Sequence, residues 1–182
     1  MDNTDLLTVP HINGEIRVFL KKLLKNGGPE PSEYERFIRI INDLEPEEIE
    51  PFREVIRPSL DQNTMQGFGF VKPYGYPGDF MIIDRIYKYH KNADTKYTNW
   101  DNFYHEQHAP QAVRNRKDYF KTVCKSFEEK SDVEKRMLIL GCGPATDVRE
   151  YLLSNRNSQI RFDLVDWDQN AIDYATENTR EF

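Results

Sequence analysis

Apolar residues in the first half of the chain recur at the spacing of an α-helix. Five side chains follow the i, i+3, i+4, i+7, i+8 order that places them on one helical face: Ile16, Phe19, Leu20, Leu23 and Leu24. The sequence Asn-Gly-Gly follows at 26–28, and glycine just after a helix commonly ends it. The pattern predicts an amphipathic helix whose apolar face packs into a core.

Two more helices are predicted from the same periodicity of polar and apolar residues. Ser32 and Glu35 have the spacing of a capping box, ahead of a stripe that consists of Tyr34, Phe37, Ile38, Ile41 and Leu44. A shorter helix is expected over residues 51–57, because Pro58 disfavours helical backbone in the residue before it. We interpret these stripes as core.

Residues 58–78 lack helical periodicity and contain four glycines and four aromatic residues. About twenty residues without periodicity is long for a compact domain, and such loops are commonly functional or disordered. The aromatic content argues against disorder, which leaves either a functional loop or a structural loop packed on the core. Asp79 is then expected to cap a helix that carries Phe80, Ile83, Ile86 and Tyr87.

The second half switches from helical to strand periodicity. After a helix over 110–128, a short apolar strand over 137–140 runs into Gly141-Cys142-Gly143, with Pro144 at the expected first helical position. A second strand over 159–165 and a helix from about 170 to 178 follow. The element order predicts an α+α/β protein: an all-α N-terminal domain over 1–109, which includes the aromatic and glycine-rich loop at 58–79, and the first β-α-β-α part of a Rossmann-like domain over 110–182.

The glycine turn and the end of the second strand indicate a nucleoside site. A strand that breaks on Gly-x-Gly into a helix presents backbone N–H groups and a positive dipole end to a ligand. Asp166 follows the second strand 23 residues after Gly143, where an acid accepts hydrogen bonds from ribose hydroxyls. Thr146 stands where the dinucleotide fingerprint has its third glycine, which argues against NAD or FAD. A Gly-x-Gly by itself also occurs as a purely structural turn.

Taken together, LILGCGPATDV and FDLVDWDQNAIDYA resemble motifs I and II of the class I S-adenosylmethionine-dependent methyltransferases. The resemblance implies S-adenosyl-L-methionine as cofactor, with Gly141, Cys142 and Gly143 at its methionine end, Asp166 on the ribose and Trp167 beside the adenine. That family often carries an acid where this chain has Ile139. Asp147, early in the next helix, is a possible stand-in for holding the cofactor's amino group.

The pair GYPGDF and QAVRNRKDYF resembles a narrower group, bacterial methyltransferases that make a 3-hydroxypalmitic acid methyl ester signal and have a helical N-terminal region. Pro77 stands where a small residue such as alanine is expected in that group. The resemblance implies a fatty or small-molecule carboxylate, or a hydroxyl, as methyl acceptor. We expect the acceptor pocket to be formed by Tyr74, Tyr76, Asp79, Arg114 and Arg116.

Composition narrows the choice of partners and compartment. The net charge of −6 disfavours a nucleic-acid surface, and no apolar run approaches the roughly 20 residues of a membrane span. The two cysteines give neither a disulfide framework nor a metal pattern. His105 and His108 share a helical face but lack a third ligand, so no metal site is expected. A cytoplasmic protein with a small-molecule acceptor is the resulting expectation.

Only two strands precede the end of the sequence, whereas a doubly wound domain needs several more. This favours a truncated form of a longer methyltransferase, inactive alone, with its catalytic residues beyond Phe182. Unpaired strand edges recruit other chains, so self-association is expected. The alternative is a non-catalytic binding or regulatory protein that retains the helical domain and a partial cofactor site.

Overall fold

The computed structural model describes residues 12–129 and 135–182. Within these ranges the chain forms two compact units, one of residues 12–71 and 91–104, the other of residues 72–90 and 105–182. The expected division at 109/110 therefore differs from the observed one. Residues 72–90 join the second unit because their helix α5 (Phe80–Tyr87) packs against α7 (His108–Glu128) and α8 (Thr146–Ser154).

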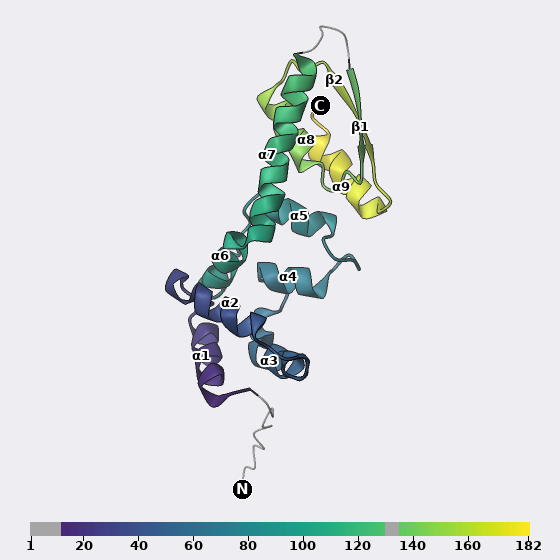
Figure 1. Cartoon of the computed structure of the whole chain (residues 1–182). Coiled ribbons are helices and arrows are strands. Elements are labelled where there is room, and N and C mark those ends of the chain that lie inside the picture. Colours follow the sequence, from purple (N-terminus) through teal and green to yellow (C-terminus); the bar gives the residue numbers. More distant parts are fainter. Residues whose placement is uncertain (1–11, 130–134) are drawn as a thin grey trace. The chain divides into compact units, whose positions relative to one another are not determined.

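The first unit is helical in its described residues (Figure 1). Its α-helices, which are joined by short 3₁₀ turns, are α1 (Gly14–Lys25), α2 (Tyr34–Asn42), α3 (Ile49–Ile56), α4 (Met65–Val71) and most of α6 (Thr98–Glu106). One apolar cluster holds α1, α2, α3 and α6 together, with Phe19, Leu20, Leu23, Phe37, Phe52, Ile56 and Trp100 buried in it. The helical N-terminal region expected from the sequence is present.

Helix α1 matches its prediction. The side chain of Asn13 accepts a hydrogen bond from the Glu15 N–H and begins the helix, and the backbone turns away through Asn26. Gly27 and Gly28 follow with φ of 71° and 125°, the left-handed region that glycine enters readily. Phe19, Leu20 and Leu23 are buried as expected.

The capping box at Ser32 and Glu35 was wrong. A 3₁₀ turn over Pro31–Glu33 precedes α2, and the reciprocal bonds join Glu30 and Glu33 instead. The buried stripe of α2 also differs, because the helix presents Phe37 and Ile40 to the core and leaves Ile41 40% exposed. Helix α3 begins at Ile49, two residues earlier than the expected start.

The stretch 58–78, expected to be a loop throughout, contains the helix α4. Its first turn is capped from a distance, because the buried carboxylate of Asp101 accepts a hydrogen bond from the Met65 N–H (2.8 Å). The Thr64 hydroxyl adds a local cap by accepting a hydrogen bond from the Gly67 N–H at 2.9 Å, whereas the bond from 36 residues away leaves no local signal. The predicted cap of α5 is confirmed, since Asp79 Oδ1 accepts from the Ile82 N–H at 2.9 Å.

The second unit contains a β-α-β element. Strands β1 (Lys135–Leu140) and β2 (Ile160–Val165) pair in parallel, with Lys135 opposite Ile160 and Leu140 opposite Val165. Helix α8 connects them, and α9 (Gln169–Thr179) follows β2. The coarse α+α/β class is thus confirmed, with mostly helical structure and a small parallel sheet in the described residues.

The two faces of this sheet have different surroundings. On one face, side chains of both strands pack against α7, α8 and α9, which lie on the same side of the sheet (Figure 1). On the other face Leu138, Leu140 and Val165 are 59%, 75% and 47% exposed. Parallel sheets usually have both faces covered, so this exposed face, which also carries the ion pair of Arg136 and Asp163, is unusual within the described part of the chain.

Pro144 is not the first helical residue. Ala145 takes a left-handed conformation with φ of 51°, and α8 begins at Thr146. The left-handed residue lengthens the turn between β1 and α8 by two positions. Among the helices of residues 12–129 and 135–182, none combines the length and apolar character that a membrane crossing requires.

Candidate ligand-binding site

A cavity of about 430 Å³ opens in the second unit where β1 and β2 end. Carboxyl ends of parallel strands are the usual place for ligands in open α/β sheets. The lining comes from the 76–87 region, α7, the glycine turn and the end of β2: Tyr76, Gly78, Phe80, Ile83, Tyr87, Arg116, Phe120, Ile139, Leu140, Gly141, Cys142, Gly143, Pro144, Asp147, Asp166 and Trp167. All six residues that the sequence assigned to a cofactor are in this set.

The glycine turn faces open space. Gly141 and Gly143 have φ of 64° and 54°, and a Cβ at Gly141 would meet no heavy atom within 4 Å. At Gly143 the nearest atom would be Cβ of Phe80, at 3.9 Å. The turn therefore leaves its backbone accessible to a ligand, which is one physical reason for glycine at such a position.

Asp166 ties the glycine turn to the end of β2. Its Oδ2 accepts a hydrogen bond from the Gly143 N–H at 2.8 Å, and its Oδ1 accepts from the Asp168 N–H at 3.1 Å. The Cys142 N–H also donates to the Val165 carbonyl at 3.0 Å. A carboxylate has about four acceptor positions, so Asp166 retains capacity for hydroxyl donors from a ligand.

Tyr76 and Trp167 form an aromatic pair at the cavity. Their ring centroids are 5.2 Å apart with planes at 55°, and Trp167 is 81% exposed. The Tyr76 hydroxyl donates to Asp168 Oδ2 at 2.8 Å. Burial and this contact with Asp168 raise the pKa of Tyr76 to about 12. Burial by itself would raise the pKa of Asp168. Hydrogen bonds from Tyr76 and Asn170 stabilise the carboxylate more strongly, so this pKa is lowered.

Asp147 and Arg116 bring opposite charges to the cavity. Burial raises the pKa of Asp147, and its hydrogen bond from the Val148 N–H and the positive charge of Arg116 offset part of that effect. Arg116 donates to the Tyr87 hydroxyl at 3.1 Å. A buried carboxyl and a guanidinium can thus meet a ligand that carries both an ammonium and a carboxylate group.

The thiol of Cys142 is not suited to nucleophilic chemistry. Burial, followed by the negative charge of Asp166, raises its pKa to about 11. The thiolate is the reactive form, and at neutral pH it is scarce here. Cys142 contributes shape to the cavity rather than a reacting group, and its backbone N–H is engaged by the Val165 carbonyl.

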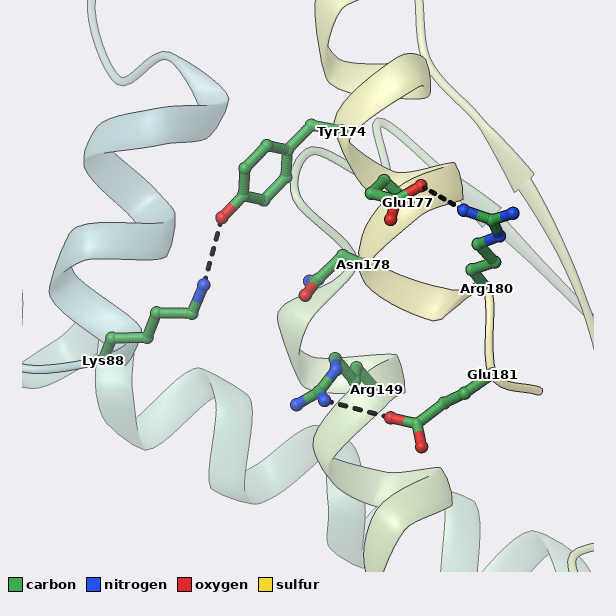
Figure 2. A pocket seen from close by; sticks show the side chains of 7 residues that line it. All are labelled: Lys88, Arg149, Tyr174, Glu177, Asn178, Arg180 and Glu181. Carbon is green, nitrogen blue, oxygen red and sulfur yellow. Dashed lines mark hydrogen bonds and ion pairs between the residues drawn. The ribbon is translucent and has the colours of Figure 1, made fainter.

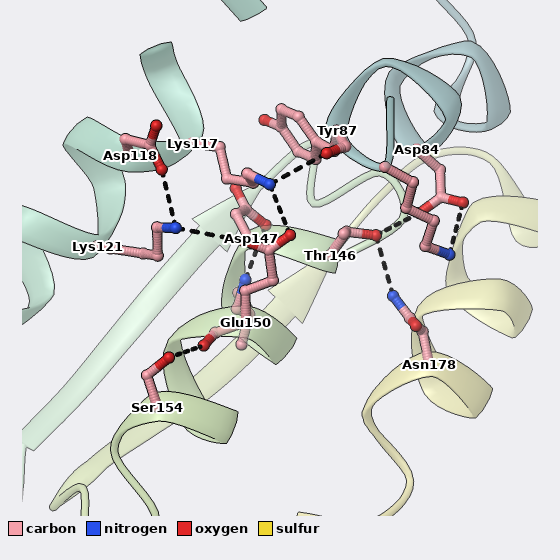
Figure 3. Close-up of polar contacts among 12 residues, drawn as sticks. Asp84, Tyr87, Lys117, Asp118, Lys121, Thr146, Asp147, Glu150, Ser154 and Asn178 are labelled. Carbon is pink, nitrogen blue, oxygen red and sulfur yellow. Dashed lines mark hydrogen bonds and ion pairs between the residues drawn. The ribbon is translucent and has the colours of Figure 1, made fainter. Parts of the chain in front are cut away.

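Asp84, a buried acid on α5, holds the beginning of α8 next to the glycine turn (Figure 3). Asp84 on α5 is 3% exposed and accepts hydrogen bonds from the Thr146 hydroxyl and, at 2.7 Å, from the Tyr174 hydroxyl. Asn178 on α9 donates to the Pro144 carbonyl at 2.9 Å and to Thr146 at 3.1 Å. Helices α5 and α9 therefore hold the beginning of α8 and the turn that borders the cavity.

Sequence reasoning missed Asp84, although a signal was present. It is an acid within the apolar run Phe80–Ile83 and Ile86 of α5, and an acid on an apolar helix is often paired when buried. A related bridge joins Lys117 on α7 to Glu150 on α8 at 2.6 Å, while Lys117 also donates to the Tyr87 carbonyl (Figure 3). Both contacts fix the cavity walls relative to one another.

The residues expected to bind the acceptor are not all at the cavity. Tyr76 and Arg116 line it, whereas Tyr74, Asp79 and Arg114 do not. Asp79 is buried and its carboxylate is engaged in capping α5. These three residues therefore lie outside the lining of this cavity.

Tyr74 and Arg114 have other contacts. The Tyr74 ring packs against Phe80 with centroids 4.5 Å apart. Arg114 donates to the carbonyl of His105 at 2.7 Å, and its guanidinium lies 4.9 Å from the centroid of the Tyr89 ring. A spacing of two helical positions already predicts that Arg114 and Arg116 face different neighbours. Only the contacts with His105 and Tyr87 show which of the two reaches the cavity.

His105 is fully buried rather than poised for a metal. Its Nε2 lies 2.7 Å from the His90 carbonyl oxygen, and its ring stacks on Tyr89 with centroids 4.2 Å apart. Across residues 12–129 and 135–182, no three or more His, Cys, Asp or Glu side chains are grouped so that they could hold a metal ion.

A larger cavity of about 810 Å³ lies between α8, the second half of α9 with the residues after it, and the end of α5 (Figure 2). Its charged side chains engage one another: Arg149 pairs with Glu181 at 3.0 Å, and Arg180 with Glu177 at 3.5 Å. Lys88 donates to the Tyr174 hydroxyl at 3.0 Å. None of the residues predicted for a site lines this cavity.

Comparison of the chain with protein-family models, curated proteins and solved structures gave no significant match.

Proposed function

We propose that the second unit binds S-adenosyl-L-methionine and that the protein is a class I methyltransferase. One observation carries this proposal: the six residues assigned to the cofactor from two sequence motifs converge on a single cavity. They come from the turn after β1, the beginning of α8 and the end of β2. The β-α-β element is compatible with a Rossmann-like sheet.

The groups at the cavity fit the parts of this cofactor. Asp166 has acceptor capacity for the ribose hydroxyls, and the glycine turn offers open backbone to the methionine part. Trp167 presents an exposed aromatic surface to the adenine, and Asp147 offers a carboxylate to the amino group. When bound, the cofactor supplies an electrophilic methyl group on a sulfonium centre. The protein's part is then to position the acceptor and exclude water.

The proposed acceptor is a fatty or small-molecule carboxylate, with a hydroxyl as the second choice. Arg116 brings a guanidinium to the cavity. One of its N–H groups donates to the Tyr87 hydroxyl. A guanidinium binds a carboxylate through two parallel hydrogen bonds. A carboxylate is already deprotonated at neutral pH and needs no general base, whereas a hydroxyl acceptor would need one.

The proposal extends to partners and compartment. We infer a cytoplasmic protein that acts on a small molecule and not on nucleic acid, in keeping with its net charge of −6. Self-association is proposed through the uncovered sheet face and the strand edges, where Leu138, Leu140 and Val165 are exposed. The alternative function is a regulatory protein that binds the cofactor without transferring its methyl group.

Asp166 gives the sharpest test of the cofactor site. Calorimetry with S-adenosylhomocysteine is expected to show binding to the 182-residue chain and a 10- to 100-fold loss in Asp166→Ala, roughly the value of a charged hydrogen bond. The matched control is Asp163→Ala, which removes an acid from β2, the strand that Asp166 follows. Asp163 pairs with Arg136 and does not line the cavity. Loss in the control alone, or equal affinity in all three proteins, would remove Asp166 from the site.

Binding and catalysis are separated by a second measurement. Transfer of a labelled methyl group to a fatty acid, assayed with the protein that binds the cofactor, distinguishes an enzyme from the regulatory alternative. Binding without transfer to any carboxylate or hydroxyl acceptor would favour the regulatory protein.

A further inference from the structure

Trp167 is unusual because a large aromatic side chain beside a cavity is 81% exposed. The other tryptophan, Trp100, is 3% exposed within the core of the first unit. An exposed indole at a cavity mouth has a free face on which a planar ring can stack. Its use as a binding surface requires that the side chain be held in one orientation.

The segment 72–79 supplies that restraint. It turns sharply, with a hydrogen bond from the Gly75 N–H to the Lys72 carbonyl and with φ of 88° and 71° at Gly75 and Gly78. The turn directs the Tyr76 ring against the Trp167 ring, with centroids 5.2 Å apart. Asp79 then fixes the end of the segment by capping α5.

The Tyr76 hydroxyl is also anchored. It donates to Asp168 Oδ2, and the other oxygen of Asp168 accepts from the Asn170 N–H at the beginning of α9. Asp168 is 8% exposed, so the acceptor is fixed within the unit. The ring of Tyr76 is therefore held at both its ends, by the turn and by its hydroxyl.

We propose that Tyr76 and Trp167 together form an aromatic wall that binds the purine base of a nucleoside ligand, with Tyr76 orienting the indole. This inference rests on the proposed cofactor site, and it moves Tyr76 from the acceptor to the base-binding part of the cavity. Asp166 lies one residue before Trp167 and is free to accept from ribose hydroxyls, so base and sugar would be bound by neighbouring residues. Stacking of a base on an aromatic side chain accounts for roughly 5- to 150-fold in affinity.

The experiment compares S-adenosylhomocysteine and adenosine binding in the wild type, Tyr76→Ala and Tyr76→Phe by calorimetry. Tyr76→Ala is expected to weaken both ligands by about tenfold or more. Tyr76→Phe keeps the ring and loses only the bond to Asp168, so a smaller loss of about two- to fivefold is expected. The matched control Tyr74→Ala removes a tyrosine from the same segment that does not line the cavity, and it is expected to bind within about twofold of the wild type.

Trp167 provides an independent readout through acrylamide quenching of its fluorescence. Acrylamide reaches the exposed Trp167 and not the buried Trp100, so protection by S-adenosylhomocysteine reports coverage of the indole. If the aromatic wall binds the base, S-adenosylhomocysteine is expected to protect Trp167 from acrylamide in the wild type. At equal saturation with this ligand, the protection is expected to be weaker in Tyr76→Ala.

The outcomes separate the two proposals. A wild type that binds neither ligand overturns the cofactor site and the aromatic wall with it. A wild type that binds while Tyr76→Ala and Tyr76→Phe keep full affinity overturns the wall alone, and Tyr76 would then only stabilise the segment 72–79. If Tyr76→Ala does not fold, Tyr76→Phe and the quenching of wild-type Trp167 decide the question.

Discussion

Two glycine turns, one in each unit, serve opposite purposes. In the first unit a Cβ at Gly27 would lie 2.4 Å from the Lys96 carbonyl oxygen, and one at Gly28 would lie 2.3 Å from the Trp100 nitrogen. In the second unit a Cβ at Gly141 would meet nothing within 4 Å. The first turn has glycine because another backbone segment occupies the space, whereas at the second turn the space is open.

Buried acids repeat this contrast. Asp101 in the first unit accepts hydrogen bonds from the backbone N–H groups of Met65 and Asn92, so it ties distant chain segments together inside that unit. Asp84 in the second unit accepts from side chains of two other elements and fixes a turn that borders a cavity. The first unit uses its polar groups to close a core, and the second uses them to keep the walls of an open site in place.

The largest expected effect is at Gly28. Gly28→Ala combines backbone strain at a φ of 125° with a clash against the Trp100 backbone, and each contribution is typically about 1–3 kcal/mol. We expect the free energy of unfolding to fall by more than about 3 kcal/mol, measured by urea denaturation with Trp100 fluorescence. The control Gly14→Ala, where a Cβ meets nothing within 4 Å, is expected to have almost no effect. Equal stability of the two variants would remove the distinction between the turns.

Gly143 is expected to show a smaller effect on stability and a selective effect on binding. Its φ of 54° costs an alanine about 1–2 kcal/mol, and Ala145 already takes such a conformation two residues later. Gly143→Ala is therefore expected to lower the melting temperature by a few degrees and to abolish detectable binding of S-adenosylhomocysteine, because the new methyl group enters the cavity. A large loss of melting temperature with affinity retained would show that Gly143 is structural, like Gly28.

The smallest expected effect concerns Asp147 and pH. Burial raises the pKa of this carboxyl above its usual 3.8, so it takes up a proton at a higher pH than ordinary aspartates do. The α-amino group of S-adenosylhomocysteine stays protonated below pH 7. Affinity for this ligand should be highest near pH 7 and decline by a few-fold as the pH falls toward the pKa of Asp147.

Adenosine, which lacks the amino group, provides the control for that titration. Its affinity is expected to stay nearly constant over the same range, and Asp147→Asn should remove the difference between the ligands. The same pH profile for both ligands would mean that Asp147 does not contact the amino group.

Much of the local structure could be predicted from spacing alone. The stripe of α1, the cap at Asp79, both strands and the helix after each were visible, because periodicity and capping depend on neighbours within a few residues. The same holds for the cluster of Gly141, Gly143 and Asp166, because parallel strands joined by one helix bring their carboxyl ends together whatever surrounds them.

What escaped prediction depended on partners distant in sequence. Helix α4 has a local cap at Thr64, but its Met65 N–H is bound by Asp101 from 36 residues away. Residues 72–90 belong with the second unit because α5 packs on α7 and α8. Which of Arg114 and Arg116 reaches the cavity depended on His105 and Tyr87, which bind one each. The sequence by itself determined the elements and the chemistry of the turn. Only the tertiary structure decided which side chains reach the cavity, because hydrogen bonds and burial between distant segments leave no periodic signal in the chain.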